Sequence, residues 1–149
     1  MVSPLTEAVD LILVENDLND AEFVIRTLSK ILPKDKILHL RDGAAFLDFL
    51  FAVGKYAHRN IRVQPKIVLL DLKLPKVNGI EVLQTMKDNP QTRSIPVVIF
   101  SASREEEDLQ MCYSLGASSY VVKPIEFKSY VETLTKLAHY WLNVNESPR

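Results

Sequence analysis

The sequence predicts an α/β fold built on a doubly wound parallel sheet. Short runs of large apolar or β-branched residues recur five times along the 149 residues, and each is followed by apolar residues at helical spacing. Two of the runs contain no polar residue, which is typical of strands covered by helices on both faces. Five alternations of strand and helix, joined by right-handed crossovers, give a sheet of five parallel strands.

The predicted strands are short. They cover residues 9–14, 37–40, 67–70, 97–100 and 118–123. The third and fourth of these are the uninterrupted apolar runs, so we expect them at the centre of the sheet.

The predicted helices each carry apolar residues on one face. They cover residues 21–32, 46–51, 80–86, 109–115 and 127–141. Pro33, Gly54 and Gly116 are placed to end the first, second and fourth helices. Ser103 is predicted to start the fourth helix, because Glu106 three residues later completes a capping box. The polar, basic segment 55–66 is predicted to be a surface loop.

Composition limits the function. With 149 residues, 47% of them hydrophobic, and only four glycines, the chain suits a single domain over 1–149, with a core at about 9–141 and short polar tails. A net charge of -1 argues against nucleic acid or membranes as partners and favours proteins. One cysteine, Cys112, excludes an internal disulfide. Without a secretory signal or a membrane-length apolar segment, we expect a cytoplasmic protein.

Polar side chains follow four of the predicted strands. Glu15, Asp71 and Lys123 come at or after the ends of the first, third and fifth strands, and Ser101 follows the fourth. The carboxyl ends of parallel strands share one edge of a sheet, so these groups are expected to converge. Each has an ordinary alternative as a helix cap, a turn or a strand end, and the combination is what predicts a site.

The four groups suit phosphoryl chemistry. A carboxylate such as that of Asp71 can act as a nucleophile and form an aspartyl phosphate. Lys123 offers a compact positive charge, and Ser101 offers a hydroxyl donor to a phosphoryl oxygen. Two acids at one edge repel each other, and Glu15 and Asp71 have the oxygen ligands that a hard divalent cation needs to relieve this repulsion.

These residues resemble the receiver domain of two-component response regulators, over approximately residues 9–141. The resemblance implies a flavodoxin-like sheet with strand order 2-1-3-4-5. It also implies that Asp71 accepts a phosphoryl group from a phosphohistidine of a sensor histidine kinase with the help of Mg2+. Ser101 then binds that group and Lys123 stabilises it. The chain would be a signalling protein that promotes its own phosphorylation and dephosphorylation, not an enzyme.

The resemblance assigns further roles by position. Asp71-Leu72-Lys73-Leu74-Pro75 is similar to the receiver's phosphorylation loop, in which the backbone carbonyl of Lys73 is an additional metal ligand. Tyr120 lies at the aromatic switch position. Pro124 corresponds to a cis-proline turn after the lysine.

One position departs from the receiver pattern. Receivers usually carry two adjacent acids after the first strand, whereas this chain has Glu15 followed by Asn16. The expected metal ligands are therefore Glu15, Asn16, Asp71 and the carbonyl of Lys73, and the loss of one charge predicts weaker Mg2+ binding. Asp17 either turns inward to compensate or caps the first helix.

The last helix is more apolar than one buried face requires. Its predicted core stripe is Phe127, Val131, Leu134, Ala138 and Trp141, and it also carries Tyr130, Leu137, Tyr140 and Leu142. We predict a homodimer through the fourth and fifth helices, with Tyr130, Leu137, Tyr140 and Trp141 at the interface. The alternative is a helix that packs more widely on the sheet. Because no second domain is expected, output would come from dimerisation, protein interaction or phosphate relay.

A narrower likeness concerns the partner. Segment 54–58 and the aromatic end of the chain resemble stand-alone receivers that pair with bacterial phytochrome kinases, notably in cyanobacteria. This implies a red-light-sensing histidine kinase as the donor. The start of the first helix, near Leu18, Asn19 and Glu22, is the expected kinase contact.

Other functions fit less well. A phosphatase of the haloacid dehalogenase type needs a second acid two residues after its nucleophile, where this chain has Lys73. A dinucleotide-binding module needs a Gly-rich turn after the first strand, where this chain has residues 15–18, Glu-Asn-Asp-Leu. A pseudo-receiver that binds proteins without being phosphorylated stays open, because Asn16 replaces an acid.

Overall fold

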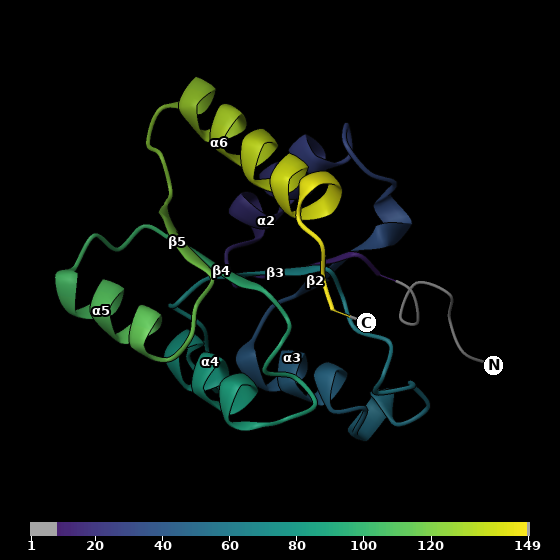
Figure 1. Ribbon diagram of the computed structural model, residues 1–149. Helices are drawn as coiled ribbons and strands as arrows, with labels where there is room; N and C mark the ends of the chain where they lie inside the picture. Colours follow the sequence, from purple (N-terminus) through teal and green to yellow (C-terminus); the bar gives the residue numbers. More distant parts are fainter. Residues whose placement is uncertain (1–8, 149) are drawn as a thin grey trace.

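The structure, a computed structural model, describes residues 9–148 and contains one five-stranded sheet (Figure 1). All neighbouring strands are parallel, in the order β2-β1-β3-β4-β5. The strands are β1 (Leu11–Val14), β2 (Ile37–Leu40), β3 (Ile67–Leu70), β4 (Val97–Ser101) and β5 (Ser119–Val122). The predicted fold class and strand order are confirmed.

Helices cover both faces of the sheet. They are α2 (Leu18–Leu28), α3 (Gly43–Leu50), α4 (Gly79–Asp88), α5 (Glu106–Ser114) and α6 (Phe127–His139), with short helical turns at Lys34–Lys36 (η1), Gly54–Tyr56 (η2) and Tyr140–Val144 (η3). Helices α2 and α6 lie on one face, and α3, α4 and α5 lie on the other (Figure 1). No helix within residues 9–148 combines the length and the apolar character needed to cross a bilayer.

The core consists of two apolar layers, one on each face of the sheet. Val68 and Leu70 of β3 face the layer under α3, α4 and α5, whereas Leu69 faces the layer under α2 and α6. Every residue of β1, β3 and β4 is buried, as uninterrupted apolar strands predict. The edge strands β2 and β5 are less buried.

The predicted stop of the first helix and the predicted start of the fourth differ from the structure. Helix α2 ends at Leu28, where the Ser29 hydroxyl donates to the carbonyl of Ile25 (2.6 Å). Helix α5 begins at Glu106, and the predicted capping box is wrong. The Glu106 carboxylate accepts from the Gln110 side chain instead of reaching back (3.3 Å), and the Ser103 hydroxyl donates to the carboxylate of Asp108 in the first turn of the helix.

Helix α4 begins in close contact with the loop that follows β3. The Asn78 side chain caps it by accepting the N–H of Glu81 (3.0 Å). A Cβ atom on Gly79 would lie 2.4 Å from the carbonyl oxygen of Asp71, so a residue with a side chain does not fit there. Gly79 thereby lets α4 support the Asp71 backbone directly.

The outer edge of β5 is partly covered by a side chain of α5. The backbone N–H of Tyr120 donates to the Tyr113 hydroxyl at 3.1 Å. On its other side β5 pairs with β4. One outward-facing amide of this edge strand is therefore already bonded.

The connection between α3 and β3 contains a buried cation, which the prediction of a surface loop did not include. The Arg59 guanidinium stacks 3.7 Å from the centroid of the Phe49 ring and donates to the carbonyls of Phe49 and Val63, the latter at 2.7 Å. These contacts fold the loop back onto α3.

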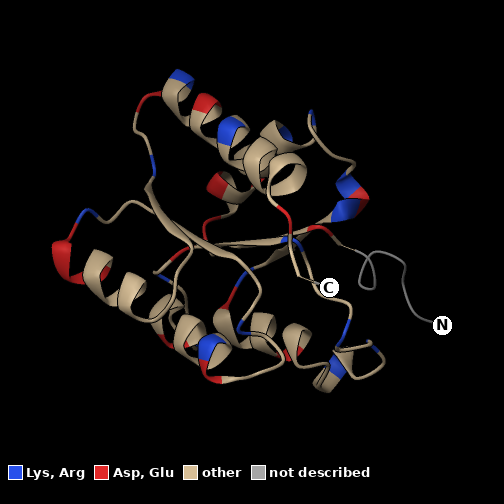
Figure 2. Cartoon of the chain, viewed as in Figure 1, with Lys and Arg blue, Asp and Glu red and all other residues tan. Residues whose placement is uncertain are grey.

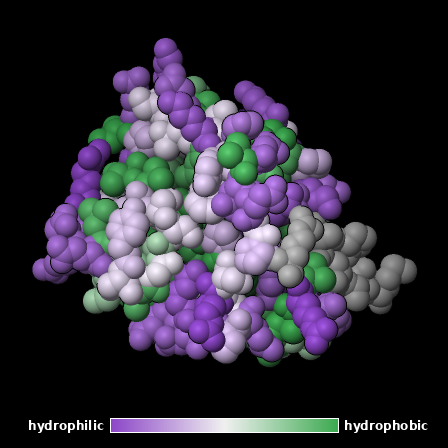
Figure 3. All heavy atoms as spheres, in the orientation of Figure 1, coloured by the Kyte–Doolittle hydropathy of each residue, from purple (hydrophilic) through white to green (hydrophobic). Residues whose placement is uncertain are grey.

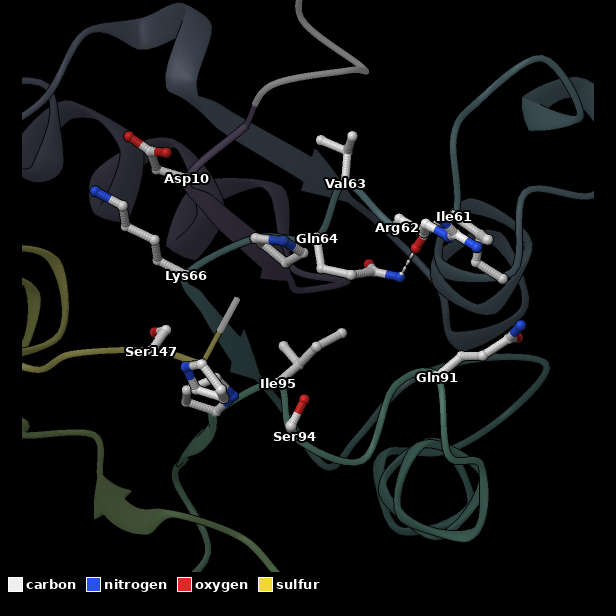
Figure 4. Close-up of a pocket in the computed structure, with 13 residues that line it drawn as sticks. Asp10, Ile61, Arg62, Val63, Gln64, Lys66, Gln91, Ser94, Ile95 and Ser147 are labelled. Atoms are coloured by element: carbon white, nitrogen blue, oxygen red, sulfur yellow. Dashed lines mark hydrogen bonds between the residues drawn. The ribbon is translucent and has the colours of Figure 1, made fainter.

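A hollow of about 680 Å³ lies at the amino ends of the strands (Figure 4). Asp10 precedes β1, Lys66 precedes β3 and Ile95 precedes β4, and all three line it together with Ser147 of the carboxyl-terminal segment. The hollow is thus at the edge of the sheet opposite the strand ends that carry the predicted site.

Candidate phosphoryl site

The predicted site residues lie together at the carboxyl edge of the sheet. Backbone hydrogen bonds continue the ladder beyond the strands: Asp71 N–H donates to Val14 (3.1 Å), and Lys123 N–H donates to Ser101 (2.8 Å). Glu15 N–H likewise donates to the carbonyl at the end of β2. The sheet therefore fixes the positions from which Glu15, Asp71, Ser101 and Lys123 project.

The Lys123 ammonium is the centre of the cluster. Its Nζ lies 2.6 Å from Glu15 Oε1, 3.0 Å from Asp20 Oδ2 and 3.1 Å from Asp71 Oδ2. The side chain of Lys123 is 9% exposed and that of Asp71 is 11% exposed. One cation thus bridges three carboxylates in a site that a donor can still reach from solvent.

Burial and the neighbouring charges shift the pKa values of Glu15 and Lys123. Burial raises the pKa of Glu15 to about 7, and the charge of Asp71 acts in the same direction while Lys123 opposes it. Burial alone would lower the pKa of Lys123, but its hydrogen bond to Glu15 and the charge of Asp71 outweigh this, so the pKa is raised. Lys123 is consequently charged at any physiological pH, and Glu15 holds its proton more tightly than an ordinary glutamate.

The oxygen donors suit a hard divalent cation. Glu15 and Asp71 offer carboxylates, and a cation bound to both would relieve the repulsion between them. Asn16 is exposed beside them, and the Lys73 N–H approaches Asp71 Oδ1 at 3.4 Å. Within the described part of the chain, no group of three or more Asp, Glu, His or Cys could hold a metal ion. Amide, backbone and solvent oxygens would therefore have to complete the coordination.

Asp17 caps the first helix rather than joining the cluster. Its Oδ1 accepts the N–H of Asp20 (3.0 Å), and its own N–H donates to Glu15 Oε2 (3.1 Å). Of the two alternatives for Asp17, the cap is confirmed. No third acid from this loop replaces the missing charge at Asn16.

The other side of the site contains three residues with hydroxyl groups, each of which makes a hydrogen bond to a backbone group or a carboxylate. Ser101, which is buried, accepts the N–H of Ser103 (3.1 Å). The Tyr120 hydroxyl donates to the carbonyl of Ser103 (3.0 Å), and the Ser103 hydroxyl donates to Asp108 Oδ2 (2.6 Å). Burial raises the pKa of Tyr120, so its hydroxyl stays neutral. The predicted switch residue is thus bonded to the loop that follows Ser101.

The predicted cis-proline at Pro124 is wrong for this structure. No cis peptide bond occurs within residues 9–148, so the bond between Lys123 and Pro124 is trans. The two isomers of a bond before proline differ by only about 0.5–1 kcal/mol, so the surrounding packing selects one and a Lys-Pro pair does not.

Two of the four residues predicted for a dimer interface belong to the core. Tyr130 and Leu137 are each 8% exposed and pack in the layer under α2 and α6. Conversely, Phe127 of the predicted core stripe is largely exposed. Helix α6 packs against α2 as well as the sheet, so its buried face differs from the predicted one. Tyr140 is exposed and Trp141 is partly buried, so only these two stay available to a partner.

Sequence reasoning missed Asp20. It lies in the first turn of α2, which begins directly after the first strand, so its side chain reaches the same edge as the strand ends. Figure 2 shows acidic positions at the starts of α2 and α5, two of the helices that begin at this edge. The usable signal was its place three residues after the helix cap Asp17.

The family is settled by comparison with known proteins. The family model for the response regulator receiver domain matches residues 11–135 of this chain. The chain belongs to the response regulator receiver family. Members of this family are signalling proteins of two-component systems and generally bind Mg2+, and the motif quoted around Asp71 lies within the matched region.

Two curated relatives align with nearly the whole receiver chain. It is 38% identical over 138 residues to the probable methanogenesis regulatory protein FilR2 of Methanothrix harundinacea, covering 93% of this chain and 86% of the relative. It is 33% identical over 138 residues to the response regulator Rcp1 of Synechocystis, covering 93% of this chain and 92% of the relative. Both alignments cover most of this chain and most of the relative.

Solved receiver structures share the fold closely. The Mn2+-bound form of Rcp1 matches with a TM-score of 0.85 at 33% identity, over 95% of this chain and 99% of the other. The phosphorylated cyanobacterial phytochrome response regulator RcpA matches with a TM-score of 0.87 at 29% identity, over 95% and 99%. The bacteriophytochrome response regulator RtBRR matches with a TM-score of 0.73 at 43% identity, over 95% and 84%.

Proposed function

We propose that this receiver takes a phosphoryl group on Asp71 from a sensor histidine kinase. The observation that carries the proposal is the Asp71 carboxylate at the end of β3, 3.1 Å from the Lys123 ammonium and 11% exposed. A carboxylate in this position is a nucleophile with a cation beside it and a path to solvent.

The transfer follows from this arrangement. A carboxylate oxygen of Asp71 attacks the phosphorus of a phosphohistidine, a P–O bond forms, and the P–N bond breaks with its electron pair leaving on the imidazole nitrogen. Lys123 neutralises charge on the phosphoryl oxygens, and the Ser101 hydroxyl donates a hydrogen bond to one of them. Mg2+, held by Glu15, Asn16, Asp71 and the carbonyl of Lys73, would supply further positive charge.

The proposed donor is a kinase of the phytochrome type. The support is the set of relatives named as phytochrome or bacteriophytochrome response regulators. Apolar side chains also surround the site: Ile125 is 96% exposed, and Leu18 and Phe127 are exposed as well. Exposed apolar residues around a charged site are typical of a surface that a partner protein covers. The name of FilR2 indicates that receivers of this type also serve other pathways.

The proposed output is dimerisation or protein interaction by a single domain spanning 1–149. Hydrophobic atoms gather between α5 and α6 in Figure 3, around an apolar hollow of about 400 Å³ that Val121, Tyr140 and Trp141 help to line. Met111 and Tyr113 of α5 are exposed on their helix. A homodimer through α5 and α6 would bury these residues. The cytoplasmic location and the lack of nucleic-acid or membrane partners stay predictions.

Incubation with acetyl phosphate and Mg2+, followed by intact mass measurement, tests the proposal. We expect one phosphoryl adduct in the wild type, none in Asp71→Asn, and a normal adduct in the control Asp48→Asn, which removes an exposed aspartate of α3. Transfer from a purified phytochrome kinase tests the donor separately. An adduct that persists in Asp71→Asn would contradict the assignment of the acceptor.

A phosphorylation-independent binding module is the second candidate, and Asn16 is the observation that favours it. The missing acid weakens the expected metal site. The same experiment separates the two candidates, because a pseudo-receiver forms no adduct with acetyl phosphate and no complex with beryllofluoride and Mg2+.

A further inference from the structure

The backbone carbonyl of Glu15 is hydrogen-bonded to a side chain of the neighbouring strand. Nε2 of His39, on β2, lies 2.8 Å from this oxygen, and the two residues are 24 positions apart in the sequence. A carbonyl oxygen can only accept, so the Nε2 nitrogen carries the proton and donates it. The bond therefore ties the edge strand β2 to the first residue of the loop that follows β1.

This carbonyl belongs to the peptide unit that joins two of the proposed metal ligands. Glu15 and Asn16 stand on either side of it, and the atoms of a peptide unit lie in one plane. A hydrogen bond to the carbonyl restricts how that plane can turn, and with it the directions in which both side chains leave the backbone. His39 thereby acts on two ligand positions at once.

The end of β2 explains why a side chain makes this contact. The N–H of Glu15 donates to the carbonyl of Leu40, the last residue of β2 (3.0 Å). A longer β2 would offer its next backbone N–H to the Glu15 carbonyl. The chain instead turns to Asp42, which caps α3 by accepting the N–H of Ala45 (2.7 Å). The His39 ring supplies the donor in place of the backbone.

Other contacts of this loop use oxygens that a cation would compete for. Glu15 Oε2 accepts the N–H of Asp17 (3.1 Å), and Glu15 Oε1 accepts from the Lys123 ammonium (2.6 Å). Both are carboxylate oxygens of the kind that bind a hard divalent cation. The bond from His39 uses a backbone oxygen outside the proposed ligand set, so it can hold the loop with and without metal.

We propose that His39 is a positioning residue for the metal site at Glu15 and Asn16. Its hydrogen bond orients the peptide unit between the two ligands before Mg2+ binds. The inference deepens the proposed function and rests on it, because it concerns the cation that assists phosphoryl transfer. Residues that orient metal ligands in this indirect way are commonly worth about tenfold or more in metal affinity.

Titration calorimetry of Mg2+ binding tests this role with two variants. At pH 8, above the Glu15 pKa of about 7, His39→Leu should bind Mg2+ about tenfold more weakly than the wild type. His39→Gln keeps an N–H donor at a similar distance from the backbone, so it should regain most of the lost affinity. Rescue by glutamine distinguishes the donated bond from the bulk of the ring.

His58→Leu is the matched control. It makes the same replacement at an exposed histidine of the connection between α3 and β3, and Mg2+ affinity should be unchanged. His39 itself is half-buried and lines an open hollow of about 740 Å³ beside α2, so leucine can take its place without entering the core. Thermal unfolding verifies that each variant is folded.

Nuclear magnetic resonance of the metal-free wild type tests the bond without any substitution. The neutral His39 ring should carry its proton on Nε2, because that nitrogen donates. The Asn16 amide shares its peptide unit with the Glu15 carbonyl, so its signal should move in His39→Leu and return toward the wild-type position in His39→Gln. A neutral ring with its proton on Nδ1 would overturn the inference.

Failure of the inference differs from failure of the proposed function. Unchanged Mg2+ affinity in His39→Leu, an equal loss in His39→Leu and His39→Gln, or an equal loss in His58→Leu overturns the inference alone. A wild-type chain that binds no Mg2+ and forms no phosphoryl adduct overturns the proposed function, and this inference with it.

Discussion

The two sides of the candidate phosphoryl site are held together by different forces. On the side of β1, β3 and α2, one ammonium bridges three carboxyl groups, and all of these groups are ionisable. On the side of β4 and α5, the contacts run through the hydroxyls of Ser101, Ser103 and Tyr120. The first side has the charges that phosphoryl transfer needs, and the second has groups that can exchange partners at small cost.

The contacts on the two sides differ in strength and in their dependence on pH. Charged contacts in a buried site are strong, depend on pH and are expensive to break singly. Hydrogen bonds of neutral hydroxyls contribute about 1 kcal/mol each and can be replaced by water or by a neighbour. We therefore expect substitutions on the charged side to have large, pH-dependent effects, and those on the hydroxyl side to have small, pH-independent ones.

The largest effect should come from Lys123→Met. Without the ammonium, Glu15, Asp20 and Asp71 face one another, and we expect the free energy of unfolding to fall by about 3 kcal/mol at pH 8. At pH 5 the loss should be smaller, because Glu15 then binds a proton. Urea unfolding at both pH values measures this, with Lys128→Met on the exposed side of α6 as the control. An equal loss at both pH values would show that repulsion among the three carboxylates is not its cause.

The next effect is the pH dependence that Glu15 confers. Its folded pKa of about 7 lies above its ordinary value of 4.5, so between these values the folded state binds the extra proton and stability falls as pH rises. From pH 5 to pH 8 this contributes a loss of about 2 kcal/mol.

Comparison with Glu15→Gln isolates that contribution. The variant cannot titrate, so its free energy of unfolding should fall less steeply between pH 5 and pH 8, and the other titrating groups cancel in the difference. If the free energy of unfolding, measured with urea, depends on pH in the same way for the wild type and Glu15→Gln, the pKa of Glu15 is not raised.

Asn16→Asp should have an intermediate effect by restoring a charge at the metal position. We expect Mg2+ to bind about tenfold more tightly, because affinity in such sites follows the number of charged ligands. Titration calorimetry measures it. Asn19→Asp adds the same charge one turn away on the exposed start of α2 and should change affinity little. Equal affinities of Asn16→Asp and the wild type would rule out Asn16 as a ligand position.

The smallest effect should follow from Ser103→Ala on the hydroxyl side. The change removes the bond to Asp108 and should cost about 1 kcal/mol of unfolding free energy. The cost should be the same at pH 5 and pH 8, because the hydroxyls of Ser103 and Tyr120 do not titrate there. Ser114→Ala, which removes a hydroxyl at the exposed end of α5, is the control. A loss of unfolding free energy that differs between pH 5 and pH 8 would contradict the expected pH independence of the hydroxyl side.

The same contrast explains what the sequence could predict. Asp71, Ser101 and Lys123 were predicted to meet because a parallel sheet places all strand ends at one edge, whatever the details of packing. Asp20 was missed because it lies on a helix, where its rotational position depends on how α2 packs. The isomer of Pro124 and the bonds of Ser103 are likewise decided by neighbours that are distant in sequence or by local competition between donors.

Helix α6 shows how tertiary packing overrides periodicity. Its sequence supports more than one apolar stripe, and a count of apolar residues cannot tell which one faces the sheet. Contact with α2 as well as the sheet buries Tyr130 and Leu137 and leaves Phe127 outside. The strands had no such ambiguity, because β1, β3 and β4 are apolar on both faces.

The Tyr113 hydroxyl on the Tyr120 amide has a consequence for assembly. An unbonded edge strand invites another chain to extend the sheet by backbone pairing, a common route to unwanted aggregation. Here a tyrosine of α5 already occupies one outward N–H of β5. A second chain that approached along this border would therefore have to displace the Tyr113 hydroxyl before it could pair with this amide, which disfavours continuation of the sheet at this position.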